Sequence, residues 1–213
     1  MRFLDIGCGT GSHTLWAAAH GAKLATGMEP ALAGSRHQQV LAVLRQAASD
    51  LGFDNVDTTD TTLQEASLPN LYDIVLVRHA INHLAEDACC VLHESEAARE
   101  EYRRIFRKLR SLMSPGGVVV FTDVARRNLL GDLGLRHPLI PAIQWYKHQS
   151  PYLWAALLKD AGFVDVRVSW LSPGVYLQAG WPLRNRVMAY LTRSEFRIAA
   201  RSSADHDHVY DRP

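Results

Sequence analysis

The stretch Leu4-Asp5-Ile6-Gly7-Cys8-Gly9-Thr10-Gly11-Ser12 decides the fold of this 213-residue chain. The residues that lead into it, 2–6, predict a short buried strand, and residues 12–19 predict a helix. A glycine turn between a strand and a helix N-terminus brings bare backbone N–H groups close to a ligand. Glycines at alternate positions let a large ligand lie against the main chain. The stretch therefore predicts a cofactor-binding turn, with the Asp5 carboxylate beside it.

The spacing of the glycines separates the classes of nucleotide site. A dinucleotide fingerprint, G-x-G-x-x-G, would need a glycine where this chain has Ser12. The phosphate loop of nucleoside triphosphatases would need a lysine directly after a glycine, and none follows Gly11. Both sites are therefore disfavoured, and a nicotinamide-dependent oxidoreductase is kept only as a minor alternative.

The segment LDIGCGTG at residues 4–11 resembles the first motif of class I S-adenosylmethionine-dependent methyltransferases, of the small-molecule, type 11/12-like kind. The resemblance implies an α/β fold, with a doubly wound, Rossmann-like sheet of seven strands. These strands would be mostly parallel, with one antiparallel strand near the C-terminus. It also implies S-adenosylmethionine as cofactor. The residues of this segment that it assigns to cofactor binding are Asp5, Gly7, Cys8, Gly9 and Gly11.

Composition limits the classes of partner. The chain is 47% hydrophobic and 21% charged, with a net charge of +1, so charge favours neither a nucleic-acid nor a membrane partner. No apolar run approaches the ~20 residues of a membrane span, and no signal peptide is visible. Cys8, Cys89 and Cys90 match neither a disulfide framework nor a zinc site. We therefore expect a cytoplasmic protein that acts on a small molecule, with the oligomeric state left open.

A second acid follows the next predicted strand, residues 22–29. Glu29 lies 18 residues after Gly11, close to the ~20 expected for a carboxylate that binds ribose hydroxyls. In the methyltransferases that the chain resembles, the acid at this place holds both ribose hydroxyls. The alternative is an acid that stabilises the start of the following helix, predicted over residues 31–51.

A third acid follows a weakly apolar strand over residues 55–59, which we expect at or near an edge of the sheet. In the resembled family, an acid after the third strand binds the adenine amino group, and the next backbone N–H meets a ring nitrogen. Asp60 and Thr61 match these two positions, and Asp57 competes with Asp60. Either acid could instead belong to a turn.

Two histidines follow the clearest predicted strand, residues 72–77, whose unbroken apolar run is typical of a parallel strand buried on both faces. In the resembled family, the following loop faces the transferring methyl group, and the resemblance adds Arg78 to the cofactor site. His79 and His83 would share one face of a helix, and either could serve as a general base. Packing or capping is the alternative for each. A zinc site is not predicted, because Ala80 breaks the H-E-x-x-H pattern.

The middle of the chain predicts a long helix over residues 87–113, with an apolar stripe and a solvated face of mixed charge. Ser114-Pro115-Gly116-Gly117 is expected to end this helix and to begin a strand over residues 118–122. Asp123 would then lie at the carboxyl end of a strand, where open α/β sheets bind their ligands.

The connection over residues 124–150 shows no clean periodicity, and long connections in compact domains are often functional. We expect it to form a substrate-side wall, with a packed helical insertion as the alternative; residues 171–194 could add to this wall. A helix over residues 151–161, a strand over 163–170 and an antiparallel strand over 195–200 complete the expected core.

The expected organisation is one domain over residues 1–201 and a disordered tail over 202–213, in which His206 and His208 are solvated rather than metal ligands. Family members usually carry helices before the first strand, so we expect the chain to be a fragment. We predict a methyltransferase that acts on a small molecule. The alternative of another class is a module that binds S-adenosylmethionine without catalysis.

Overall fold

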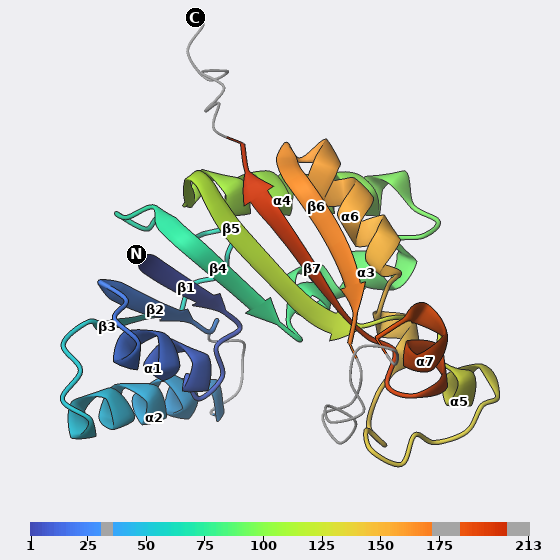
Figure 1. Ribbon diagram of the computed structural model, residues 1–213, viewed down its shortest axis with the longest axis horizontal. Helices are drawn as coiled ribbons and strands as arrows, with labels where there is room; N and C mark the ends of the chain where they lie inside the picture. Colours follow the sequence, from blue (N-terminus) through green and yellow to red (C-terminus); the bar gives the residue numbers. More distant parts are fainter. Residues whose placement is uncertain (31–35, 172–183, 204–213) are drawn as a thin grey trace, which may run out of the picture.

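The computed structural model describes residues 1–30, 36–171 and 184–203. Within them, seven strands form one sheet in the order β3-β2-β1-β4-β5-β7-β6 (Figure 1). The strands are β1 (Arg2–Ile6), β2 (Leu24–Met28), β3 (Val56–Thr59), β4 (Tyr72–Arg78), β5 (Met113–Val124), β6 (Phe163–Trp170) and β7 (Glu195–Ser202). Only β7 runs antiparallel to its neighbours, β5 and β6. This arrangement confirms the expected fold class, including the position of β3 at an edge.

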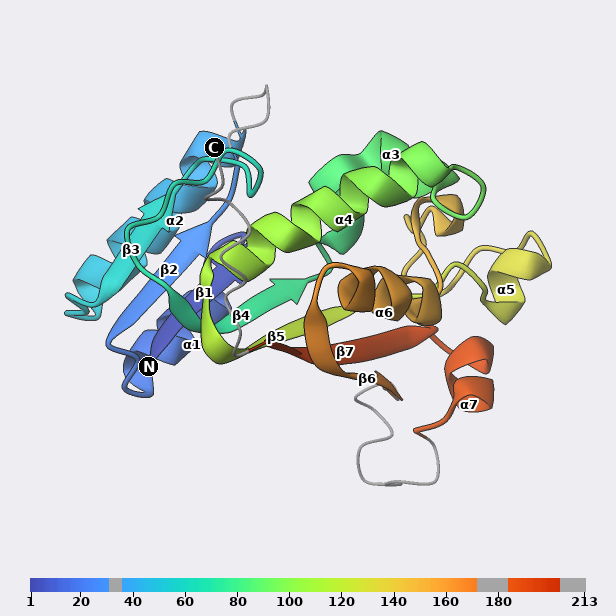
Figure 2. The same ribbon diagram turned by 90° about the horizontal axis from the view of Figure 1, so that it is seen from above.

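Helices cover both faces of the sheet (Figures 1 and 2). The α-helices are α1 (Ser12–Ala19), α2 (Arg36–Asp50), α3 (Glu86–Val91), α4 (Glu96–Ser111), α5 (Leu129–Asp132), α6 (Pro151–Asp160) and α7 (Arg186–Leu191). Two short 3₁₀ helices are η1 (Ile81–Ala85) and η2 (Trp145–Lys147). None of the helices in the described residues is both long enough and apolar enough to cross a membrane.

The side chains of β1 alternate between the two faces of the sheet and show which helices cover each face. Phe3 packs with Ala17 and Ala18 of α1, whereas Leu4 and Ile6 belong to the large core under α4 and α6. Successive side chains of a strand point to opposite faces, so a central strand whose residues 3–6 are all buried must be covered on both sides. The large core contains most of the buried aromatic side chains, including Trp154, which is fully buried.

The predicted helix over residues 87–113 is wrong in one respect, because it is two helices. Ser95 has an extended backbone and interrupts the helix, and its hydroxyl accepts a hydrogen bond from the Ala98 amide, 3.2 Å away. Serine in this position satisfies an amide that the first turn of a helix leaves without a partner. The segment therefore divides into α3 and α4.

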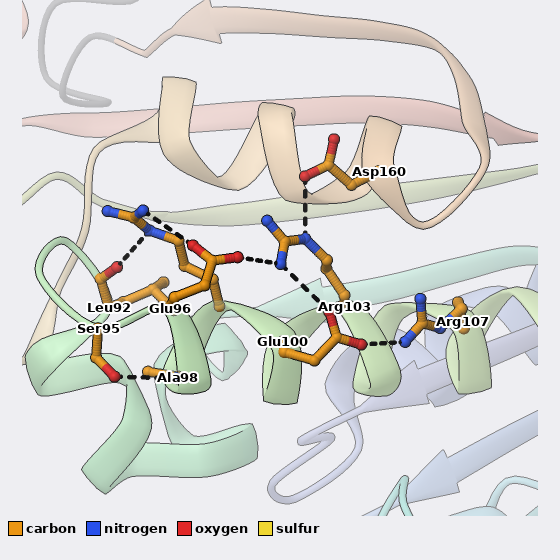
Figure 3. A network of polar contacts seen from close by, with 9 residues as sticks. Leu92, Ser95, Glu96, Ala98, Glu100, Arg103, Arg107 and Asp160 are labelled. Atoms are coloured by element: carbon orange, nitrogen blue, oxygen red, sulfur yellow. Dashed lines mark hydrogen bonds and ion pairs between the residues drawn. The ribbon is translucent and has the colours of Figure 1, made fainter.

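The exposed face of α4 carries the expected mixed charges. Arg103 lies at the centre of a polar network and contacts Glu96 at 2.6 Å, Glu100 at 3.2 Å and Asp160 of α6 at 3.1 Å (Figure 3). The opposite face of α4 is buried, and its apolar residues include Tyr102, Phe106 and Leu109. This helix is therefore a structural element with a solvated outer face.

Two further boundaries differ from the predictions. Residues Ser114–Gly117 do not form a turn before the strand, because β5 already begins at Met113 and absorbs them in an irregular pairing with β4. β7 extends to Ser202, which is buried, so the chain is ordered beyond the predicted start of the tail. Residues 204–213, with His206 and His208, lie outside the described residues, as do the first five residues of the helix predicted over 31–51.

Candidate functional site

The register of the sheet aligns the first residues after three parallel strands. Ile6 pairs with Met28, and Met28 pairs with Thr59, at the carboxyl ends of β1, β2 and β3. Gly7, Glu29 and Asp60 therefore begin their loops along one edge of the sheet. This is the edge at which open α/β sheets bind ligands.

The three glycines of the first loop have different surroundings. All three have positive φ angles: 72° at Gly7, 52° at Gly9 and 80° at Gly11. A Cβ on Gly7 would lie 2.5 Å from the Cβ of Ala80, and a Cβ on Gly11 would collide with Leu44. A Cβ on Gly9 would meet no atom within 4 Å. Packing within the protein therefore requires Gly7 and Gly11, whereas Gly9 borders open space where a ligand could lie.

The prediction of bare N–H groups in this loop is wrong for four of its amides. The Gly7 and Cys8 amides donate to the Met28 carbonyl, and the Gly11 amide donates to the Cys8 carbonyl. The Gly9 amide donates to Glu29 Oε2 at 2.9 Å. Buried backbone amides in proteins are nearly always hydrogen-bonded, and Met28 at the end of β2 and Glu29 directly after it accept three of these four bonds. The loop is thus tied to the end of β2, with the Glu29 carboxylate directly against it.

The Asp5 carboxylate lies beneath the loop. It is 1% exposed, and Thr14 of α1 donates to its Oδ2 at 3.1 Å. Burial raises the pKa of Asp5, although the Thr14 hydrogen bond opposes this effect. Burial also raises the pKa of the Cys8 thiol to about 12, so Cys8 stays protonated at neutral pH. Both side chains therefore support the loop from inside the protein.

The structure separates the two candidate acids near β3. Both acids are exposed, but Asp57 lies within the strand, opposite Thr26 of β2, whereas Asp60 follows the strand. Thr61 lies beside it, with its hydroxyl 2.9 Å from that of Thr59. The position of Asp60 at the ligand-binding edge agrees with the role that the family resemblance implies for it.

The segment after β4 is not the helix that the spacing of His79 and His83 suggested. Arg78 is the exposed last residue of β4, and the η1 helix begins only at Ile81. His79 lies between them with a φ of 51°, and its amide donates to the Thr122 carbonyl at 2.7 Å. This hydrogen bond to β5 extends the strand pairing by one residue, so the two histidines do not share a helical face.

A cavity of about 390 Å³ nevertheless brings both histidines together. Asn82 and Asp123 also contribute to its wall, and so does Arg193. The connection over 124–150 contributes apolar side chains, among them Ile140 and Ile143, and a third histidine, His148. The cavity is therefore bounded by polar side chains from the ends of β4 and β5 and by an apolar wall from this connection.

Asp123 is the centre of a cluster in this wall. Its Oδ1 lies 3.3 Å from Nδ1 of His148 and 3.8 Å from Nδ1 of His79. Burial alone would raise the pKa of Asp123, but the two neighbouring histidines outweigh it and hold the pKa below its usual range. Nε2 of His79 lies 3.6 Å from Glu195 of β7, so this ring stands between two carboxylates.

His83 has a different environment. Its side chain is 58% exposed, and its Nδ1 lies 3.0 Å from Glu86 Oε2 at the start of α3. The side chain of His79 is 34% exposed and that of His148 is 13% exposed. His83 is thus a rim residue, whereas the other two histidines contact the buried carboxylate.

Contacts with α3 hold His148 in place from both sides. Lys147 Nζ lies 2.5 Å from Glu86 Oε1. The backbone carbonyl of Lys147 accepts a hydrogen bond from the Cys89 thiol. Gln149, which is 1% exposed, donates to the Cys89 carbonyl at 2.6 Å. Sequence reasoning singled out none of His148, Arg193 and Glu195 as a site residue. His148 and Arg193 fall within the two segments expected to form the substrate-side wall, 124–150 and 171–194, whereas Glu195 was expected only as part of the last strand.

The sequence and the fold were compared with those of known proteins, and both match methyltransferases. A family model described as a methyltransferase domain matches residues 1–168. The chain is similar to the apo S-adenosylmethionine-dependent methyltransferase SibL, with 19% identity, a TM-score of 0.57, and coverage of 95% of this chain and 50% of SibL. A methyltransferase from Mesorhizobium loti, also S-adenosylmethionine-dependent, shows 20% identity and a TM-score of 0.61, over 94% and 90% of the two chains.

The [4+2]-cyclase SpnF is also similar, with 20% identity and a TM-score of 0.58, over 96% of this chain and 75% of SpnF. At these identities, the structural likeness concerns the fold alone. The chain spans half the length of SibL. No curated protein matches it.

Proposed function

This chain belongs to the methyltransferase domain family, with S-adenosylmethionine as its cofactor, and we propose that it methylates a small molecule held in the cavity beside His79. One contact carries the proposal. Gly7 of the cofactor loop approaches Ala80 so closely that a Cβ would not fit between them, and the neighbouring residue, His79, lines the cavity. The cofactor loop and the acceptor cavity therefore adjoin at residues 79 and 80.

The loops after β1, β2 and β3 fit the cofactor, since Gly9 borders open space and Glu29 and Asp60 stand on the same edge. Glu29 would hold the ribose hydroxyls, and Asp60 with the Thr61 amide would hold the adenine. The remaining residues that we assign to this site are Gly7, Cys8, Gly9, Gly11 and Arg78, with Asp5 supporting the loop from below.

When bound, the cofactor supplies a methyl group already activated on a sulfonium. The protein needs to align the acceptor and exclude water. Alignment of two reactants can lower the activation barrier by ~7–11 kcal/mol.

We assign the role of general base to His79 when the acceptor must lose a proton. Its ring lies between Asp123 and Glu195, whose charges attract the positive charge that the imidazole gains. His83 is the weaker of the two predicted candidates, because it faces solvent and pairs with Glu86.

The alternative is a module that binds S-adenosylmethionine without methyl transfer. A similar fold in the [4+2]-cyclase SpnF shows that this architecture is not confined to proteins named as methyltransferases. The family match favours both readings over the nicotinamide-dependent oxidoreductase.

Two measurements on the full chain test the proposal. Titration calorimetry with S-adenosylmethionine should show binding, with NADH as the negative control. Incubation with a panel of small acceptors should then release S-adenosylhomocysteine. Binding without release from any acceptor class would favour the binding module, and absence of S-adenosylmethionine binding would refute the site assignment.

A further inference from the structure

We infer that the acceptor is a small amine that enters the cavity as an ammonium ion and is recognised by the carboxylate cluster around Asp123. This inference rests on the proposed methyl transfer and names the substrate class of that site. It depends on the charges, the unpartnered atoms and the apolar lining of the cavity.

The fixed charges of the cavity wall leave Asp123 without a permanent cation. Lys147 is committed to Glu86 at 2.5 Å, and Arg193 Nη1 lies 3.9 Å from Glu195. In the part of the chain that the structure describes, Asp123 has only the two histidines as ionic partners, and a histidine is charged only when protonated. An ionised carboxylate that is 1% exposed needs a positive charge nearby, and a ligand ammonium would provide one.

Four buried polar atoms of the wall lack a hydrogen-bond partner among the described residues. Two are nitrogens, Nδ1 of His148 and Nε of Arg193, whose side chains already face the carboxylates of Asp123 and Glu195. The other two are oxygens, Oδ2 of Asp123 and Oδ1 of Asn82, on residues that are 1% and 3% exposed. Buried polar atoms in folded proteins are nearly always satisfied. Both oxygens accept hydrogen bonds, so the missing partner is a donor. An ammonium group has up to three donors and a positive charge, which it would add to that of the two histidines.

Other acceptor classes fit this wall less well. A carboxylate would approach Asp123 against its charge, and the two cations of the wall, Lys147 and Arg193, already face Glu86 and Glu195. An alcohol would bring a donor without a charge. The apolar side chains of Val124, Ile140 and Ile143 suit a hydrocarbon body attached to the amine. A volume of about 390 Å³ lies near the lower end of ligand pockets, which favours a small molecule.

The reaction balances with groups already present. The ammonium gives one proton to His79, which becomes an imidazolium between Asp123 and Glu195. The neutral amine then attacks the methyl carbon: a nitrogen–carbon bond forms while the carbon–sulfur bond breaks, and the electron pair of that bond goes to sulfur. The positive charge of the sulfonium thus ends on the methylated ammonium, and His79 returns its proton to solvent.

The test compares matched acceptors that differ in one functional group. Phenethylamine, 2-phenylethanol and phenylacetate, with an alkyl series of the same three groups, are incubated with the full chain and S-adenosylmethionine. S-adenosylhomocysteine formation should be at least about tenfold faster with the amines. Faster transfer to the alcohols or carboxylates would overturn the inference while leaving the proposed methyl transfer intact.

Binding measurements decide the case in which no acceptor reacts. The same ligands are titrated into the protein saturated with S-adenosylhomocysteine. Tighter binding of the amines supports the inference without turnover, and equal or weaker binding overturns it. Failure of S-adenosylhomocysteine itself to bind would count against the proposed function and not against the choice of an amine.

Variants identify the recognising group. Asp123→Asn keeps the shape of the side chain but removes its charge, and it should lower amine affinity about tenfold or more without affecting the alcohols. Asp87→Asn is the matched control, since Asp87 is exposed on α3 and does not line the cavity. If thermal melting shows that Asp123→Asn is unfolded, Glu195→Gln takes its place, because Glu195 is the other carboxylate beside His79. This variant should also reduce the preference for amines over alcohols. Unchanged preference in a folded variant of Asp123 would refute the assignment.

Discussion

The two halves of the ligand-binding edge are built differently. In the proposed cofactor half, after β1, β2 and β3, the polar groups already have partners in the protein: Gly9 with Glu29, and Asp5 with Thr14. In the proposed acceptor half, after β4 and β5, the cluster around Asp123 keeps buried oxygens without a partner in the described ranges.

This difference separates two ways of building a site. In the proposed cofactor half, glycines and backbone hydrogen bonds set the shape of the loop, so we expect it to change little when its ligand binds. The acceptor half leaves polar atoms for the ligand to satisfy, and such atoms are costly in the free protein. Variants in the two halves should therefore fail in different ways.

The largest effect is expected for Gly9→Val in the cofactor half. The new side chain points into the open space beside the loop, so S-adenosylmethionine binding should fall below detection by calorimetry. The free energy of unfolding should drop by only about 1–2 kcal/mol, the cost of the left-handed backbone. Gly11→Val is the matched control: its side chain collides with Leu44, which adds ~1–3 kcal/mol of overpacking. Normal S-adenosylmethionine affinity in Gly9→Val would refute the proposal that the cofactor occupies the space beside Gly9.

The next effect concerns the acceptor half. His79→Gln should lower kcat by about 10²–10⁴ if this ring is the general base, with S-adenosylhomocysteine affinity unchanged. His83→Gln should leave kcat nearly unaltered, since His83 faces solvent. Single-turnover kinetics with a reactive acceptor distinguish the two. A greater loss of kcat in His83→Gln than in His79→Gln would assign the general base to His83.

Glu29→Ala should weaken S-adenosylhomocysteine binding by about 1–3 kcal/mol, because a charged hydrogen-bond partner is lost. The variant also leaves the Gly9 amide without its acceptor. Glu29→Gln is the useful comparison, since its amide oxygen can still accept from Gly9 while the charge is gone. Equal affinities for Glu29→Gln and the unmodified protein would mean that Glu29 supports the loop and does not bind ribose as an ion.

A smaller effect distinguishes the two acids near β3. Asp60→Asn should cost about 1 kcal/mol of S-adenosylhomocysteine affinity, the usual value of one hydrogen bond. Asp57→Asn should leave the affinity unchanged, because Asp57 lies inside the strand and not at its end. Calorimetry on both variants decides between them, and the reverse result would move the adenine contact to Asp57.

The smallest effect is expected outside both halves, in the network on α4. Hydrogen bonds from Arg103 and Arg107 lower the pKa values of Glu96 and Glu100 respectively. These carboxyls stabilise the fold above the usual glutamate pKa of about 4.3, and this contribution is lost as pH falls through their lowered values. Arg103→Met should therefore lower Tm slightly at neutral pH and not at acidic pH. A change in cofactor affinity would show that the network reaches the site.

Much of the fold followed from local patterns. The strand, glycine turn and helix over residues 2–19 were predicted with the same boundaries as β1 and α1. The break at Ser95 was missed, because a capping serine inside a charged, helix-favouring stretch gives a weak signal unless the backbone around it is known. The bulge in β5 was missed because a Pro-Gly-Gly sequence normally signals a turn.

By itself, the sequence determined the fold class and predicted a cofactor site at the ends of the first three strands, since these depend on short-range spacing: a glycine turn after one strand, and single acids after the next two. Only the tertiary structure decided which side chains meet in the proposed acceptor half. Asp123, His148 and Glu195 lie on separate segments, and they meet because β7 inserts beside β5 and the 124–150 connection is anchored to α3. No periodicity records such contacts, because the groups that make them are brought together by packing and not by spacing along the chain.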